Sequence, residues 1–119
     1  MNKRITQQEI NIHGNKFSYL DKEVDCSIAI KNDIAVIKRE AVESHRDSFN
    51  TLYDTSSIAP QKIRIFLMGD IPLYCMIIYT IQYKDSNNGR YACGNYYPFY
   101  DKGETVFVSP HPFQGSICW

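Results

Sequence analysis

Apolar and polar residues alternate with a period of two at the start of the chain. The alternation runs over residues 9–13 and again over residues 16–20. Between them lie Gly14 and Asn15, which both tolerate the positive φ angles that two-residue hairpin turns require. The pattern therefore predicts a first β-hairpin.

A second pair of segments has the same character. Residues 26–30 and 34–38 are rich in isoleucine, valine and alanine, and they flank Asn32 and Asp33. β-Branched residues favour strands, and asparagine and aspartate favour turns. The pattern predicts a second hairpin directly after the first.

The period changes between residues 40 and 53. Val42, His45, Phe49 and Leu52 or Tyr53 recur at intervals of three and four residues, with polar and charged residues between them. This spacing is typical of an amphipathic helix that packs one stripe against a sheet. Polar residues and Pro60 follow it and predict the end of the helix.

The second half of the chain returns to strand patterns. The predicted strands are residues 62–67, 73–83, 90–94 and 105–108. The second of them is almost continuously apolar, which is typical of a central strand covered on both faces. Pro110 and Pro112 end the last strand because proline lacks the amide that the ladder needs.

These elements predict one α+β domain over residues 1–119, since 119 residues suit a single core. We expect an antiparallel sheet of about six to eight strands, with the amphipathic helix near residues 40–53 packed on it. A strongly curved sheet or half-barrel wrapped around the helix is the alternative.

Charge and hydropathy narrow the classes of function. Lys+Arg and Asp+Glu both total 13, so the basic excess of a nucleic-acid binder is missing. The longest apolar stretch, residues 71–81, contains Pro72 and is too short to cross a membrane. The basic start of the chain is followed by polar residues, which is unlike a secretory signal. We therefore expect a soluble, cytoplasmic protein.

The cysteines give no metal or redox motif. Cys26, Cys75, Cys93 and Cys118 show no Cys-x-x-Cys pair and no other recognised metal spacing. Most of them lie in strand patterns, where a reduced cysteine acts as a small apolar residue. The sequence favours the reduced state, and it predicts neither a metal nor a cofactor.

Two alternatives to a binding protein stay open. Cys93, His111 and Asp101 are the right types for thiol catalysis, but no catalytic or phosphate-binding motif accompanies them. An enzyme is therefore the less favoured interpretation. A small-molecule site in a curved sheet is the other alternative, and its expected lining is Tyr79, Tyr83, Tyr91 and Phe107.

The densest feature is the aromatic segment over residues 96–100. Strict alternation places Tyr96 and Pro98 on one side of a strand and Tyr97 and Phe99 on the other. The rings therefore cannot all face one core, and those left outside either cover the sheet or bind a partner.

We expect a small protein-binding or inhibitor domain, of which bacterial toxin-neutralising immunity proteins are one kind. The chain is rich in Ile, Asn, Lys and Tyr, whose codons are AT-rich, and this suggests an AT-rich gene, as in some bacterial islands, but no motif identifies a family. The partner would be another protein, such as a cognate toxin whose active site is blocked. The predicted partner-binding residues are Tyr96, Tyr97, Phe99, Tyr100, Asp101, Glu104, His111 and Trp119.

Overall fold

One helix and seven strands make up the described part of the protein, residues 4–113 of a computed structural model. Side chains are described for residues 4–39 and 52–113. The elements are β1 (Ile5–Asn11), β2 (Lys16–Tyr19), β3 (Lys22–Asp25), α1 (Ser27–Leu52), β4 (Tyr53–Met68), β5 (Ile71–Tyr83), β6 (Gly89–Lys102) and β7 (Thr105–Val108).

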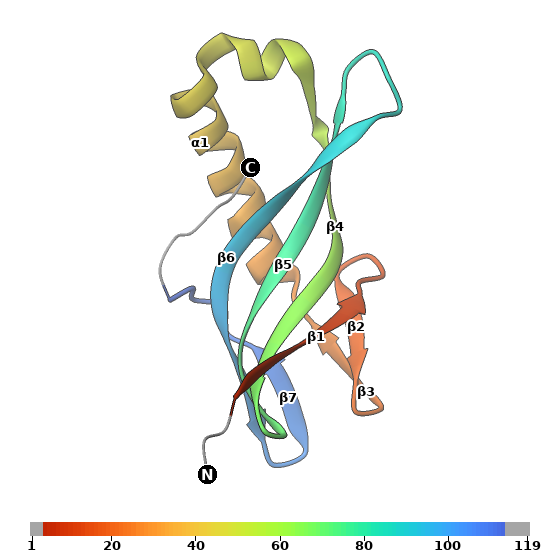
Figure 1. Cartoon of the computed structure of the whole chain (residues 1–119), viewed down its shortest axis with the longest axis vertical. Coiled ribbons are helices and arrows are strands. Elements are labelled where there is room, and N and C mark those ends of the chain that lie inside the picture. Colours follow the sequence, from red (N-terminus) through yellow and green to blue (C-terminus); the bar gives the residue numbers. More distant parts are fainter. Residues whose placement is uncertain (1–3, 114–119) are drawn as a thin grey trace.

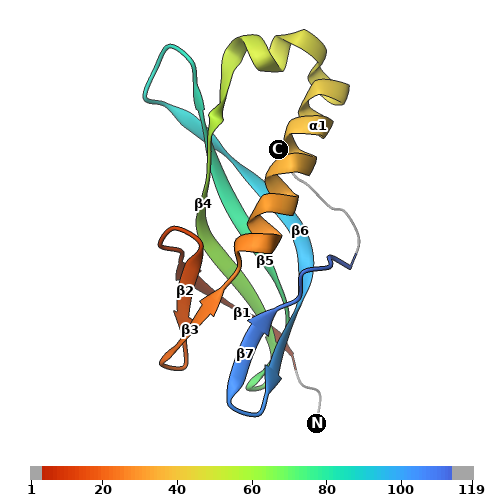
Figure 2. The ribbon, with the colours of Figure 1, turned by 180° about the vertical axis from the view of Figure 1, so that it is seen from behind.

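A five-stranded antiparallel sheet forms the main layer, in the order β1-β4-β5-β6-β7, and β2 and β3 form a separate hairpin. Figure 1 shows the long, twisted strands in front of α1, and Figure 2 shows the helix from its own side. We call the sheet face toward α1 the inner face and the opposite face the outer face. One antiparallel layer with one helix confirms the predicted α+β class.

The strands of the second half agree well with the sequence pattern. Residues 62–67 lie in β4, residues 73–83 in the central strand β5, and residues 105–108 form β7. Gly69, with a φ of 62°, makes the turn between β4 and β5. β6 is much longer than predicted, because it continues from Gly89 through the whole aromatic segment.

The predicted second hairpin is wrong, because residues 26–38 belong to the helical region. α1 begins at Ser27, where the Asp25 carboxylate accepts hydrogen bonds from the Ser27 amide (2.8 Å) and hydroxyl (2.6 Å). The buried positions follow a helical spacing, while Ile28 is 60% exposed. Those buried residues are Cys26, Ala29, Ile30, Asp33 and Ile37. Of the predicted stripe, Val42, His45 and Phe49 lie outside the described side chains. Leu52 is exposed at the end of α1, and Tyr53 is buried but begins β4.

The predicted first hairpin is also wrong in its pairing. β1 pairs with β4, from Ile5 opposite Met68 to Asn11 opposite Lys62. Only one bridge, between His13 and Lys16, joins the two segments expected to pair. Gly14 does make the predicted turn, with a φ of 66°, and β2 then pairs with β3.

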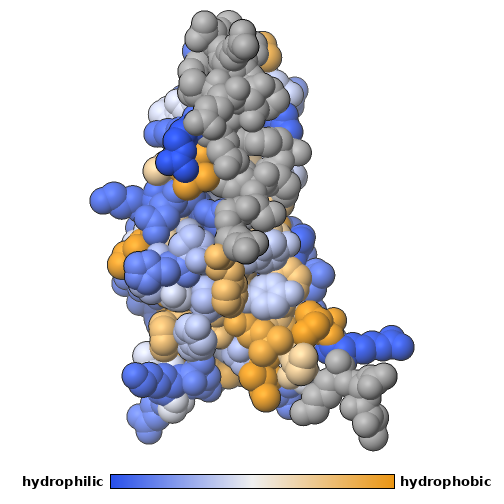
Figure 3. All heavy atoms as spheres, turned by 90° about the vertical axis from the view of Figure 1, so that its left-hand side faces the viewer, coloured by the Kyte–Doolittle hydropathy of each residue, from blue (hydrophilic) through white to orange (hydrophobic). Residues whose placement is uncertain are grey.

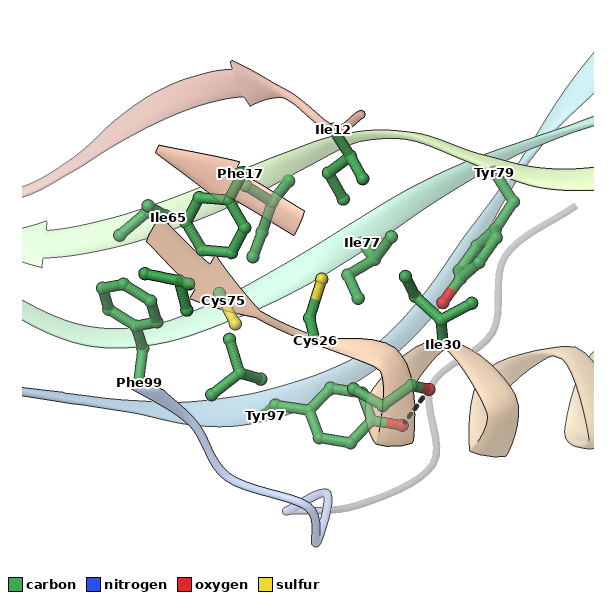
Figure 4. Close-up of a cluster of buried hydrophobic side chains, with 14 of the residues drawn as sticks. Ile12, Phe17, Cys26, Ile30, Ile65, Cys75, Ile77, Tyr79, Tyr97 and Phe99 are labelled. Carbon is green, nitrogen blue, oxygen red and sulfur yellow. Dashed lines mark hydrogen bonds between the residues drawn. The ribbon is translucent and has the colours of Figure 1, made fainter. Parts of the chain in front are cut away.

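The core lies between α1, the β2–β3 hairpin and the inner face of the sheet. Figure 4 shows side chains from these elements converging, among them Phe17, Ile30, Ile77 and Phe99. Because every layer contributes, burial in this core fixes which side of β4, β5 and β6 faces inward.

The two-residue loop between β2 and β3 is conformationally unfavourable. Tyr19 pairs with Lys22, and the residues between them, Leu20 (φ 51°) and Asp21 (φ 62°), are both left-handed. Residues other than glycine, asparagine and aspartate disfavour this region, so the conformational cost lies mainly at Leu20, whereas Asn-Gly suits such a turn. We expect Leu20→Asn with Asp21→Gly to raise the free energy of unfolding by about 1 kcal/mol, as measured by urea denaturation. An unchanged or lower value would contradict this account of the turn.

Within residues 4–113, no helix combines the length and the apolar character that a membrane span requires.

Candidate functional site

The aromatic segment of β6 divides between the two faces of the sheet. Tyr97 and Phe99 point inward and have no exposed surface. Tyr96 is half-buried on the outer face, and Tyr100 is 47% exposed. The predicted alternation is therefore confirmed. Tyr97 and Phe99 belong to the core, so the surface that a partner can reach does not include their rings.

An aromatic cluster lies on the outer face, built from Phe66, Tyr74, Tyr96 and Phe113. Phe66 stacks on Tyr74 with ring centroids 4.6 Å apart, and Tyr96 meets both rings at 6.0 and 5.7 Å. Phe113 meets Tyr74 edge-on at 6.3 Å and is 57% exposed. Strands β4, β5 and β6 thus present one continuous group of rings away from the core.

An aliphatic patch extends this cluster toward the edge of the sheet. Ile5 pairs with Met68, and Met68 pairs with Ile71, so these side chains are neighbours on one face. Their exposed fractions are 44%, 37% and 59% respectively. Figure 3, which views the molecule from its β6 side, shows hydrophobic residues in the lower part of that side, with hydrophilic residues next to them. At this end the outer face therefore carries apolar side chains from β1, β4, β5 and β6, whereas Glu9, Lys62 and Arg64 form ion pairs farther along β1 and β4.

The segment after β7 is held along the edge of β6. The Ser109 amide donates to the Pro98 carbonyl and the Phe113 amide to the Tyr96 carbonyl, each at 2.9 Å. The Asn32 side chain donates to the Pro110 carbonyl at 3.0 Å. These bonds fix Phe113 against the aromatic cluster.

The remaining predicted site residues lie apart from the rings. His111 is exposed on the segment after β7, and Asp101 and Glu104 are exposed at the turn between β6 and β7. Trp119 lies outside the described residues. The structure therefore brings Tyr96 into the aromatic cluster and leaves the charged residues near the lower end of the sheet in Figure 1.

A buried polar network joins α1 to the sheet, and the sequence pattern does not predict it. The Asp33 carboxylate, fully buried on α1, accepts hydrogen bonds from the hydroxyls of Tyr79 (2.5 Å) and Tyr97 (2.8 Å). It also accepts from the backbone amide and side-chain amide of Asn95, both at 3.1 Å. The Tyr97 hydroxyl also lies 3.1 Å from the Ala29 carbonyl, the contact drawn as a dashed line in Figure 4.

Burial is the largest influence on the pKa values of the groups in this network. It raises the pKa of Asp33 above its ordinary value of 3.8, although the hydrogen bonds from Tyr79, Asn95 and Tyr97 act in the opposite direction. Burial and the nearby Asp33 carboxylate also raise the pKa of both tyrosine hydroxyls. The network is shut off from solvent, so we interpret it as a link between helix and sheet and not as a catalytic site.

The three cysteines within residues 4–113 do not form a thiol site. Cys93 is disulfide-bonded, so the reduced state predicted for it is wrong and its thiolate cannot serve as a nucleophile. Cys26 and Cys75 are free and buried. Burial raises the pKa of Cys26 to about 12 and raises that of Cys75 as well, which keeps both protonated near neutral pH.

The residues expected to line a small-molecule site do not converge. Tyr79 is buried against Asp33, and Phe107, on β7, packs beside Tyr100 of β6. Tyr83 and Tyr91 are exposed near the opposite end of β5 and β6. A shallow hollow of about 230 Å³ lies there between β5, β6 and their turn, and it includes Tyr91 but none of the other three.

Among residues 4–113, no three histidine, cysteine, aspartate or glutamate residues group in a way that could hold a metal ion. Comparisons with protein-family models, with curated proteins and with solved structures find no match for this chain. The case for function therefore depends on the surface described above.

Proposed function

We propose that the protein binds another protein through the outer face of its sheet and inhibits it. The observation that carries this proposal is the continuous apolar surface formed by the aromatic cluster and by Ile5, Met68 and Ile71. Monomeric proteins rarely expose large contiguous apolar patches unless these serve an interaction. Tyrosine, phenylalanine and methionine are also enriched at the centres of interfaces.

The outer face is well prepared for docking. Its rings already contact each other, and hydrogen bonds hold Phe113 in place. A partner would therefore meet side chains that lose little conformational freedom on binding. This favours a rigid contact surface of the kind that an inhibitor needs to cover a partner's active site, and a cognate bacterial toxin is the partner we propose.

The test removes exposed apolar side chains without touching the core. We expect Met68→Ser, Ile71→Ser and Phe113→Ser together to weaken partner binding at least about tenfold, because each loses buried apolar area at the interface. The matched control carries Ile28→Ser, Leu52→Ser and Tyr91→Ser, which are 60%, 54% and 59% exposed elsewhere. A partner captured with wild-type protein would be purified, and its affinity and its own activity measured with each variant. Equal binding by both triple variants would rule out the outer face.

The state of Cys93 in cells tests the compartment in which the protein acts. The sequence favours the cytoplasm, which is part of the immunity-protein proposal. A disulfide at Cys93 favours an oxidising compartment. We expect Cys93 to resist thiol alkylation in intact cells, whereas labelling there would support a cytoplasmic site of action.

A further inference from the structure

Three turns lie together at the lower end of the molecule, as Figures 1 and 2 both show. They join β2 to β3, β4 to β5 and β6 to β7. Packing ties the first of them to the third, since the Tyr19 ring, beside the β2–β3 turn, meets Phe99 of β6 edge-on at 5.2 Å. We call these turns and their flanking residues the turn end.

The turn end exposes large apolar side chains. Leu20 is 67% exposed, Ile71 59% and Tyr100 47%. Ile71 also belongs to the aliphatic patch through its pairing with Met68. The turn end is therefore continuous with the outer face.

Carboxylates surround these apolar residues. Asp21, Asp70, Asp101 and Glu104 are all exposed, and within the three turns they outnumber the ammonium groups of Lys22 and Lys102. Asp101 and Asp70 act on the same neighbouring group, since after burial they are the causes that raise the pKa of Tyr19. Two different turns thus contribute negative charge to one place.

Leu20 combines exposure with an unfavourable backbone. A leucine at a φ of 51° costs stability that asparagine or glycine would not, and its side chain faces solvent. Neither the core nor the turn requires leucine at this position, which leaves contact with a partner as the role that fits it.

We infer that the turn end binds the part of the partner that carries apolar side chains beside lysine or arginine. This inference rests on the proposed function and extends it by naming the chemistry of the partner. Leucine, isoleucine and tyrosine side chains provide apolar contact, and the carboxylates of Asp70 and Asp101 select a basic surface through complementary charge.

The test uses a synthetic amphipathic peptide of lysine and leucine as the probe. Its matched controls are the same peptide with glutamine, or with glutamate, in place of every lysine. We expect the lysine peptide to bind wild-type protein about tenfold more tightly than the glutamine peptide at low salt. Added salt should reduce that advantage by screening. Chemical-shift changes should centre on Leu20, Asp70, Ile71 and Tyr100.

Variants then locate the site. Leu20→Asn with Asp21→Gly should weaken lysine-peptide binding about tenfold while raising the melting temperature, so lost binding is not lost folding. Asp70→Asn with Asp101→Asn should remove the preference for lysine over glutamine. Asp85→Asn removes an exposed carboxylate beyond the other end of β5 and should leave that preference unchanged.

The outcomes separate this inference from the proposed function. Equal affinity for the lysine and glutamine peptides would overturn the basic partner and leave apolar docking on the outer face standing. Lysine-peptide binding that both turn-end variants retain would overturn the turn end as its location. Failure of the proposed function would appear instead as unchanged partner binding by the triple variant of Met68, Ile71 and Phe113.

Discussion

Replacing Asp33 with alanine should lower the free energy of unfolding by roughly 3 kcal/mol, because buried donors left without an acceptor cost about 1–3 kcal/mol each. The change would remove the acceptor for Tyr79, Tyr97 and both Asn95 groups. Removal of a buried carboxylate offsets part of this loss. Urea denaturation of the purified variant measures the result.

Asp33→Asn is the matched control. The asparagine oxygen can still accept from Asn95 and Tyr97, and the Tyr79 hydroxyl can accept from the new amide. We expect its stability to stay within about 1 kcal/mol of wild type at neutral pH. Equal stability of the alanine and asparagine variants would show that the network does not hold the helix to the sheet.

The difference in stability between wild type and Asp33→Asn should depend on pH, and its sign follows from the pKa of Asp33. Burial raises the pKa of Asp33 in the folded state above 3.8. Between 3.8 and that raised value, the folded protein binds more protons than the unfolded chain. The stabilisation from protonated Asp33 is therefore complete below 3.8 and is lost as the pH rises through the folded-state pKa. Denaturation at stepped pH should show wild type losing stability relative to Asp33→Asn over this window, and a constant difference would contradict it.

The second large effect is expected at Gly94. A Cβ at this position would overlap the Asp33 carboxylate and lie 3.0 Å from Cε2 of Tyr79. Neither Asp33 nor Tyr79 can move freely, since both side chains are buried and the Tyr79 hydroxyl donates a hydrogen bond to Asp33. We expect Gly94→Ala to lower the free energy of unfolding by about 3 kcal/mol, the upper range for overpacking.

Gly103 provides the comparison for this prediction. It has a φ of 66° with nothing within 4 Å of its added Cβ, so Gly103→Ala carries only a backbone cost of about 1 kcal/mol. The two alanine variants would be compared by thermal and urea denaturation. If Gly94→Ala cost no more than Gly103→Ala, the close approach of β6 to Asp33 would be of no consequence.

The second half of the chain was predictable because its signals are local. Residues 62–67 and 73–83 combine β-branched residues with turn residues at their ends, and they fold as strands of the main sheet. The two sides of the aromatic segment also followed from alternation alone. Such predictions need only the period and the flanking residues.

The prediction for the first half of the chain was wrong because the structure of this half depends on contacts with residues far along the sequence. Residues 26–38 satisfy a strand pattern locally, yet helical spacing also places Ala29, Asp33 and Ile37 on one buried face. The deciding partners of Asp33 lie on β5 and β6, far along the chain. Asp33 itself looked like a turn residue, so its burial gave no local signal. β1 likewise finds its partner in β4 and not in its neighbour.

The candidate site was only partly accessible from sequence. The sequence predicts Tyr96 and Tyr100 as binding residues because aromatic density is visible in the chain, but Phe66 and Tyr74 are single rings within ordinary strand patterns. Their contact with Tyr96 requires the register of β4, β5 and β6. Ile5, Met68 and Ile71 also become one patch only through strand pairing.

The register shift in β6 near Gly94 and Asn95 determines which face of the sheet each later side chain of β6 occupies. Ile78 pairs with Cys93 but Met76 pairs with Tyr96, so β6 contains one more residue than β5 between these two pairs. Without that extra residue, each later side chain would change sides. Tyr97 and Phe99 would then meet solvent, and Tyr96 and Tyr100 would turn toward the helix. One inserted residue thus keeps Tyr97 and Phe99 in the core and places Tyr96 and Tyr100 on the face for which we propose partner binding.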